Sequence, residues 1–213
     1  MTTDLRDRRP PRRRTEAPRQ RRPRPRRGSP EETRSRLVAA AAAEFNRVGY
    51  RGTDSNRIAR AAGYAPGTFY KHFPDKRAVF LAAYEAWVTA EWNTIEGVLR
   101  QRGSRGELAS RLVDEVLLMH RHWRGLRASL RALVAEDGSA RDFYRRQRMR
   151  QVKLLAALHG RKQPSETDAV LLYTFERVCD AIADGELREL GLRVEATVEL
   201  LRQLAREHLR GSR

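Results

Sequence analysis

The sequence predicts an all-α protein of about nine helices, and two observations carry this prediction. From residue 31 onward, apolar residues recur at intervals of three or four positions, which is the period of an amphipathic helix. Glycines and prolines interrupt that pattern at intervals, and no segment alternates apolar and polar residues for long enough to form a strand.

Three short helices are expected first. Acidic residues at the start of the first helix suit the positive end of its dipole. Asp54 is the expected N-cap of the second, and Gly63 allows the sharp turn that follows it. Pro66 suits the first turn of the third, where its missing N–H has no helical role. The expected ranges are 31–49, 55–62 and 66–72.

Six longer helices should follow. Pro74 ends the three-helix unit, and Asp75 begins a helix that continues to about Leu99. Later breaks at glycines and at Pro164 separate the remaining segments. The expected ranges are 75–99, 107–123, 126–136, 141–159, 166–186 and 194–209.

The chain is strongly basic, and its charge is unevenly placed. Among 213 residues, 44 are Lys or Arg and 27 are Asp or Glu, which gives a formal net charge of +17. This excess indicates a polyanionic partner, either nucleic acid or an anionic membrane surface. Residues 1–30 are rich in Arg and Pro and poor in apolar residues, which predicts a disordered tail. The predicted organisation is a tail (1–30), a unit of three short helices (31–77) and a larger helical domain (78–213).

Several classes of protein are excluded. The single cysteine, Cys179, cannot form an internal disulfide, and a reducing compartment is expected. Because no apolar run approaches the roughly 20 residues of a membrane span, we expect a cytoplasmic protein without a membrane partner. We find no nucleophile–base pair, phosphate-binding glycine loop or metal-ligand cluster, so we expect no enzyme activity, cofactor or metal. His120 and His122 cannot chelate together, since residues two apart on a helix point about 200° from each other.

Residues 58–73, IARAAGYAPGTFYKHF, carry the functional prediction. After the turn at Gly63, hydrogen-bond donors follow one another on a short helix, which can reach base edges and phosphates in a major groove. This stretch resembles the DNA-binding signature of TetR-type transcriptional regulators, and Gly49-Tyr50 upstream and Asp75-Lys76 downstream match as well. Ala65 stands where the family often has Ser, and Tyr64 replaces a small aliphatic residue, so its ring must repack or point outward.

The resemblance implies a role in DNA binding for nine residues. The start of the second helix should meet phosphates, and the start of the third should face the groove. The later residues of the third helix should clamp the phosphate backbone of the DNA. The implied residues are Ser55, Asn56, Pro66, Gly67, Thr68, Tyr70, Lys71, His72 and Lys76. Core packing is the alternative for Tyr70, and it is the expectation for Phe73.

The resemblance further implies that the C-terminal helices bind an effector and pair two copies of the chain. A mostly apolar pocket would suit a hydrophobic or amphipathic small molecule. The candidate pocket residues, each of which could equally be plain core, are Trp92, Met119, Trp123 and Tyr173. Two apolar stripes at helical spacing are candidates for a four-helix dimer interface or for packing within one chain: Leu171, Phe175, Val178 and Ile182, and Val194, Val198, Leu201 and Leu204.

The predicted function is a ligand-responsive, sequence-specific DNA-binding repressor. A homodimer would bind a palindromic operator, because twofold symmetry in the protein requires it in the site. An effector would shift the long fourth helix and so change the separation of the two DNA-binding units. Activation in place of repression stays open. The alternative is a non-specific or architectural nucleic-acid-binding protein that depends on the basic tail.

Overall fold

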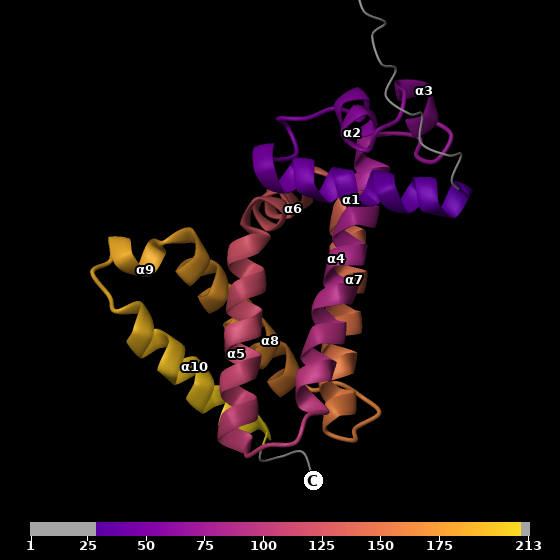
Figure 1. Cartoon of the computed structure of the whole chain (residues 1–213). Coiled ribbons are helices and arrows are strands. Elements are labelled where there is room, and N and C mark those ends of the chain that lie inside the picture. Colours follow the sequence, from indigo (N-terminus) through magenta and orange to yellow (C-terminus); the bar gives the residue numbers. More distant parts are fainter. Residues whose placement is uncertain (1–28, 210–213) are drawn as a thin grey trace, which may run out of the picture.

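A computed structural model describes residues 29–209, which form ten helices and no strand (Figure 1). The all-α prediction is confirmed. The additional helix is the four-residue α9, which the left-handed Gly185 (φ 87°) separates from α8. The helices are α1 Pro30–Val48, α2 Ser55–Ala61, α3 Pro66–Phe69, α4 Lys76–Leu99, α5 Arg105–His122, α6 Arg124–Glu136, α7 Gly138–Leu158, α8 Glu166–Asp184, α9 Glu186–Glu189 and α10 Val194–His208.

The first helix begins at the edge of the predicted tail. Ser29 is its N-cap: the Ser29 hydroxyl accepts from the backbone N–H of Glu32 (3.2 Å), and the Glu32 carboxylate accepts from the N–H of Ser29 (3.1 Å). This reciprocal capping box satisfies two backbone donors that the helix leaves free. Ser29 and Pro30 therefore belong to the folded part, and the rest of the predicted tail, residues 1–28, lies outside the described residues.

The third helix is shorter than predicted. It spans Pro66–Phe69, a single turn, and the residues after it continue as hydrogen-bonded turns. Its N-cap, Ala65, supplies no side-chain bond, in agreement with the missing hydroxyl noted in the sequence. Phe69 and Phe73 are both buried and hold this segment against the core from its two ends.

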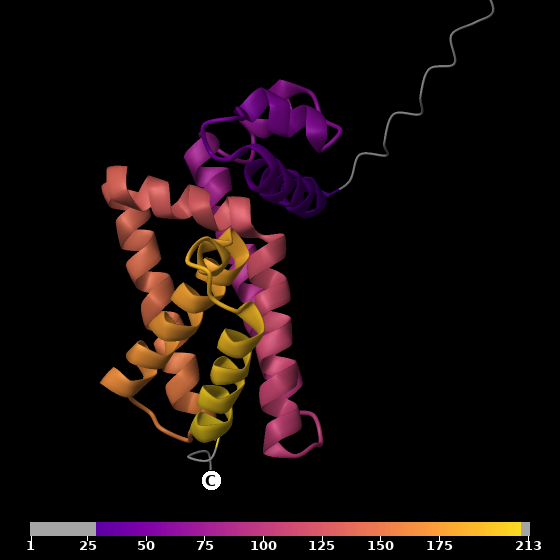
Figure 2. The same ribbon diagram turned by 90° about the vertical axis from the view of Figure 1, so that its left-hand side faces the viewer.

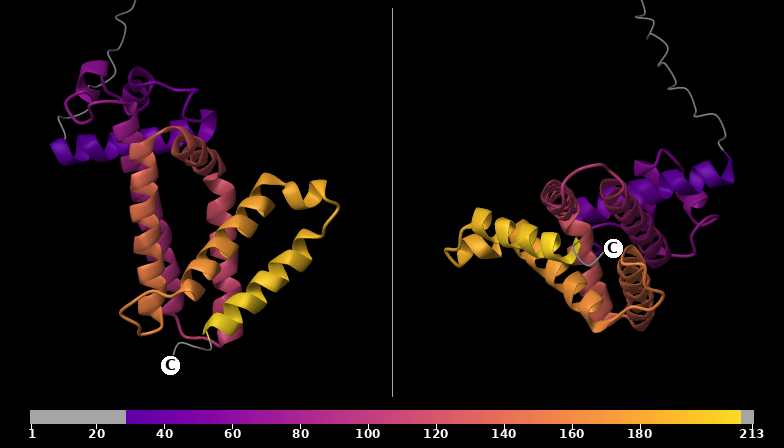
Figure 3. Two further views of the ribbon diagram at one scale, coloured as in Figure 1. Left: turned by 180° about the vertical axis from the view of Figure 1, so that it is seen from behind. Right: turned by 90° about the horizontal axis from the view of Figure 1, so that it is seen from below.

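The molecule has α1–α3 at one end and the last turn of α10 at the other (Figures 1 and 2). Helix α1 lies across the ends of α4 and α6, and α4 then runs away from it beside α7 (Figure 3). Helix α5 packs against α4, α8 and α10. No helix within residues 29–209 is long and apolar enough to cross a membrane.

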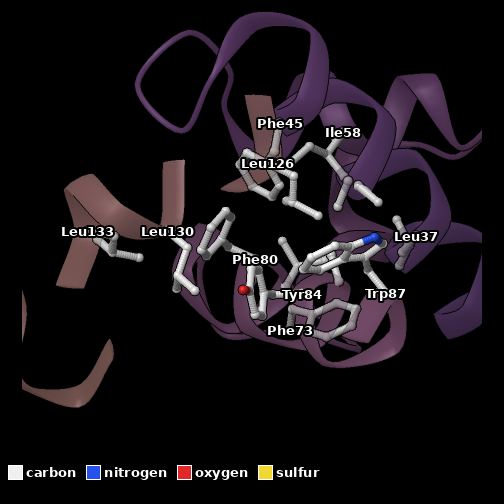
Figure 4. Close-up of a cluster of buried hydrophobic side chains, with 14 of the residues drawn as sticks. Leu37, Phe45, Ile58, Phe73, Phe80, Tyr84, Trp87, Leu126, Leu130 and Leu133 are labelled. Carbon is white, nitrogen blue, oxygen red and sulfur yellow. The ribbon is translucent and has the colours of Figure 1, made fainter. Parts of the chain in front are cut away.

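Two apolar clusters stabilise this arrangement. The first joins the N-terminal unit to α4, α6 and α7 around Phe45 and Phe80, whose rings meet edge to face at 4.9 Å (Figure 4). The second lies among α5, α8 and α10 around Val113, Cys179 and Leu201. Burial raises the pKa of the Cys179 thiol to about 12, as expected of an inert buried cysteine.

Candidate functional site

The turn between α2 and α3 has the geometry of a helix-turn-helix. Gly63 adopts a φ of 83°, a left-handed conformation that glycine takes at little cost. The next residue returns toward α2, since the N–H of Tyr64 donates to the carbonyl of Ala59 (2.9 Å). Tyr64 is half-buried and packs against the first apolar cluster, so its ring is repacked into the fold.

Most residues predicted to bind DNA lie on the surface of this unit. Tyr70 is 57% exposed, whereas Phe73 is 3% exposed. The core alternative for Tyr70 is therefore wrong, and the expectation for Phe73 is confirmed. The residues at positions 56, 67 and 71 are exposed as well, those at 66, 68, 72 and 76 are partly exposed, and Ser55 is buried.

Lys76 has a structural role that the sequence did not indicate. Its ammonium donates to the carbonyl oxygens of Tyr50 (2.9 Å) and Thr53 (3.0 Å), and it lies 4.3 Å from the centre of the Tyr50 ring. These contacts fix the loop between α1 and α2 to the start of α4. An ammonium has three N–H donors, so a phosphate contact through the third stays a prediction.

Helix α6 fastens the N-terminal unit to the rest of the chain. The side-chain amide of Asn46 accepts from the N–H of Gly125 (3.0 Å) and of Leu126 (3.2 Å), so it caps the start of α6 from α1. The Ser129 hydroxyl accepts from the N–H of Tyr50 (3.0 Å) and donates to the carbonyl of Gly125 (2.8 Å). Movement of α6 would therefore be transmitted directly to α1.

A large cavity lies beyond the contact between α1 and α6, among α4, α5, α7, α8 and α10. It encloses about 870 Å³ of unfilled space, counting the part that opens to solvent. Leucine is the most frequent residue of its walls, with Trp92, Ile95 and Phe175 among the other apolar residues. An apolar cavity with a few polar groups is the usual form of a small-molecule site.

Several charged groups lie where α6 forms part of the cavity wall. Arg127 of α6 is 5% exposed and donates to both Asp180 (2.7 Å) and Glu176 (2.7 Å) of α8. Arg148 of α7 also bonds Glu176. These partners raise the pKa of Arg127 and lower that of Asp180, although burial opposes the charged form of each. The buried network thus connects the cavity wall to α6, the helix whose start Asn46 caps.

The comparisons decide the family. Residues 37–83 match the family model described as "Bacterial regulatory proteins, tetR family". This range begins within α1, includes α2 and α3 whole, and ends within α4. The chain carries a TetR-family DNA-binding domain. Its helix-turn-helix unit is accordingly a DNA-binding one, as predicted.

Solved structures extend the likeness to the whole TetR-type fold. The fatty acid degradation regulator FadR from Bacillus halodurans is 17% identical, with a TM-score of 0.56 over 84% of this chain and 96% of that one. A protein from Rhodococcus sp. described as a TetR-family regulator is 19% identical (TM-score 0.64; 85% and 98%). A regulator from Saccharomonospora viridis, solved in complex with choline, is 20% identical (0.60; 84% and 96%). At such identities these structures share the fold, and a search of curated proteins gave no match.

The four predicted effector residues of this TetR-family chain are dispersed. Trp92 lines the large cavity, and Tyr173 lines a neighbouring one of about 570 Å³ that shares Arg127 and Glu176 with it. Met119 packs against the second apolar cluster, and Trp123 packs against the first where α5 meets α6. Neither is among the residues that line these two cavities, so a role for them in effector binding stays a prediction.

The predicted dimer stripes mainly serve packing within the chain. Leu171 and Phe175 line the cavity, and the second apolar cluster takes up Val178, Ile182, Val194, Val198 and Leu201. This occurs because α5 packs against both α8 and α10 and turns those stripes inward. Leu204 is half-buried. The exposed large apolar residues of α8–α10 and their loop are instead Val170 (65%), Tyr173 (49%), Leu190 (71%), Leu192 (54%) and Leu200 (65%).

One group of potential metal ligands lies where α7, α8 and α10 converge. Single ligand atoms of His159, Asp168 and His208 all lie within 4.8 Å of one another. However, Asp168 already caps α8 through Ser165 and pairs with Arg161 (2.5 Å), which places a positive charge beside the group. The sequence did not bring these three residues together, because they are separated by loops whose path only the fold defines.

Proposed function

We propose that the chain is a ligand-responsive repressor whose DNA-binding unit (31–77) is controlled by a small apolar or amphipathic molecule in its helical domain (78–213). The observation that carries this proposal is the cavity, which two helices connect to the DNA-binding unit. Helix α4 starts directly after the helix-turn-helix and lines the cavity through Trp92. Helix α6 lines it through Arg127 and is capped by Asn46 of α1.

A ligand acts on such a protein only through a difference in its affinity for the DNA-bound and released states. A molecule that fills the cavity presses on α4 and on the Arg127 network at the same time. Both helices begin at the N-terminal unit. A shift of either would therefore reorient α3, which we call the recognition turn. The choline bound by the Saccharomonospora viridis regulator supports a small-molecule effector as the class.

The proposed unit that binds the operator is a homodimer. Two copies place two recognition turns on a palindromic site, one or more helical turns of DNA apart. The exposed apolar residues at the α8–α10 end, above all Leu190, Leu192 and Leu200, support pairing there. We propose contacts to phosphates and bases from the exposed groups around α3, including Asn56, Thr68 and Lys71.

Selection from random duplexes tests the proposal. The purified chain should enrich a palindromic site, and binding to that site should be competed by its specific duplex and not by a scrambled one. Thr68→Ala should lower the preference for the site. Recovery of sequences without twofold symmetry would contradict the proposed dimeric repressor.

The alternative, non-specific binding through the basic tail, predicts a different result. Its affinity would be equal for all duplexes and would fall steeply with salt, because phosphate contacts release counterions. Deleting residues 1–28 should weaken binding to every duplex and flatten the salt dependence, while leaving the operator preference in place. Equal affinity for every duplex in the full chain, lost together with the tail, would favour the alternative.

A further inference from the structure

Glu91 is a buried carboxyl group that the fold leaves without a bonding partner. It lies on α4, is 6% exposed and lines the large cavity. Its nearest basic atom is Nε2 of His120, at 4.0 Å, which is too long for a hydrogen bond. Among residues 29–209 no donor bonds the Glu91 side chain. A buried carboxylate is costly unless it is paired, so this position calls for an explanation.

The charges that face Glu91 from the other helices are already used. On α6 and α7, Arg127 and Arg148 bond the α8 carboxylates Glu176 and Asp180. On α5, Nδ1 of His120 bonds Asp180 (2.9 Å), and burial lowers the pKa of this imidazole. The Asp180 carboxylate can only accept in this bond, so Nδ1 of His120 carries the proton that it donates. Arg131 of α6 bonds Asp180 as well (2.7 Å), and none of these three guanidinium groups bonds Glu91.

The surroundings of Glu91 suit a positively charged nitrogen with an apolar tail. Trp92 and Phe175 line the same cavity, and aromatic faces attract ammonium groups. Leucines of α4, α5, α7 and α8 form much of the remaining wall, where an alkyl or ring system would bury apolar surface. Gln151, His159 and His208 also line the cavity. Burial raises the pKa of Glu91 to about 7. A cation bound beside it would favour the ionised carboxylate.

We propose that the effector of this regulator is an amphipathic cation, an amine or a quaternary ammonium compound, and that Glu91 is the residue that selects it. This inference rests on the proposed function, because it names the ligand class of the same cavity. The competing feature is Nε of Arg148, a buried donor without a bond, which would favour an anionic head group. The test therefore includes an anion with the same tail.

Three probes with one tail length separate these possibilities: octylammonium, 1-octanol and octanoate, each titrated below its solubility limit and, for the two charged probes, below the micellar concentration. Calorimetry and the fluorescence of the tryptophans report binding. The cation should bind about tenfold or more tightly than the alcohol, since a bond to a charged group contributes about 1.5–3 kcal/mol. The preference should decline between pH 8 and pH 6 as Glu91 takes up a proton. Tighter binding of octanoate, or no binding of the cation, overturns the proposal.

Two variants of α4 form a matched pair for the same titrations. Glu91→Gln should reduce the affinity for the cation about tenfold, abolish its dependence on pH and leave the affinity for octanol within about twofold. Glu85→Gln, which changes an exposed residue of the same helix, should alter none of the three affinities. Unchanged binding of the cation by Glu91→Gln overturns the proposal. The ranking by the unaltered chain tests it even if that variant does not fold.

A parallel titration with the selected duplex keeps the two proposals apart. Fluorescence anisotropy of labelled DNA reports whether each probe releases it. If the cation binds through Glu91 and DNA binding does not change, the ligand response of the proposed function fails and the selectivity stands. If octanoate releases the DNA and the cation does not, the selectivity fails and the ligand response stands.

Discussion

Asn46 of α1 and Gly125 of α6 are in contact through both side chain and backbone. The Asn46 side chain accepts from the N–H of Gly125 (3.0 Å), and a Cβ on Gly125 would lie 1.9 Å from the carbonyl oxygen of Asn46. Only glycine allows this approach. The contact joins the DNA-binding unit to the helix that carries Arg127, so it is a point at which a signal from the cavity would pass.

Gly125→Ala should destabilise the chain and weaken the docking of α1 on α6. The added methyl group meets backbone, which cannot rotate away, and overpacking of this kind costs about 1–3 kcal/mol. Gly97→Ala is the control, since it is exposed on α4 with nothing within 4 Å, and it should stabilise that helix by about 0.5–1 kcal/mol. Urea unfolding measures both, and equal effects of the two variants would contradict the close approach.

Arg127→Met should be among the most destabilising single changes. It removes one buried partner from each of two carboxylates, and breaking a buried pair from one side costs up to about 3–5 kcal/mol. Asp180 keeps His120 and Arg131, and Glu176 keeps Arg148. Arg124, on the same helix as Arg127, pairs with Asp184 of α8 and is 60% exposed. Its replacement in Arg124→Met should therefore cost less than about 1 kcal/mol. Chemical denaturation gives the comparison, and a small effect of Arg127→Met would show that the network contributes little to stability.

Glu91→Gln should change how stability depends on pH. The pKa of Glu91 is about 7 in the fold and near 4.5 when unfolded. The unfolded chain thus releases this proton first, and the stability of the unaltered protein should fall between about pH 4.5 and 7 by up to ~3 kcal/mol. The variant lacks this loss, so its advantage should grow from pH 5 to pH 8. His120 and Asp180 titrate in both proteins and largely cancel in the difference.

Lys71→Ala should weaken binding to all duplexes and lower the slope of log affinity against log salt by about 1, as expected for one lost phosphate contact. Lys71 is exposed directly after the recognition turn. Lys162→Ala removes the same charge from the exposed α7–α8 loop at the other end of the chain and should leave the slope unchanged. A change in sequence preference in place of a changed slope would assign Lys71 to a base.

Leu200→Arg should yield monomers and a large loss of operator affinity. Leu200 is 65% exposed on α10, on the side of the helix opposite the buried Leu201 and Ala205 stripe. Leu118→Arg is the control, because Leu118 is similarly exposed (62%) but lies on α5. Light scattering gives the mass of each variant. A dimeric Leu200→Arg would place the interface elsewhere.

The helical periods and the motif around Gly63 were sufficient to predict the fold class and the DNA-binding unit. Both are local properties: glycine at φ 83° and prolines at the first helical turns act through their own backbone. The length of α3 was not predicted: after Phe69 the chain continues as hydrogen-bonded turns, and Phe69 and Phe73 are both buried.

Residues that act through partners distant in sequence could not be assigned in this way. Glu91 was one acidic residue among many until α5, α6, α7 and α8 enclosed it, and Lys76 was expected at phosphate until its ammonium met two loop carbonyls. The stripes of α8 and α10 were identified correctly as apolar, but periodicity does not say which neighbour covers them. The sequence alone determined the helices and the chemistry of the recognition turn. The tertiary structure decided which side chains are exposed, paired or left without a partner, because burial and pairing depend on contacts between helices.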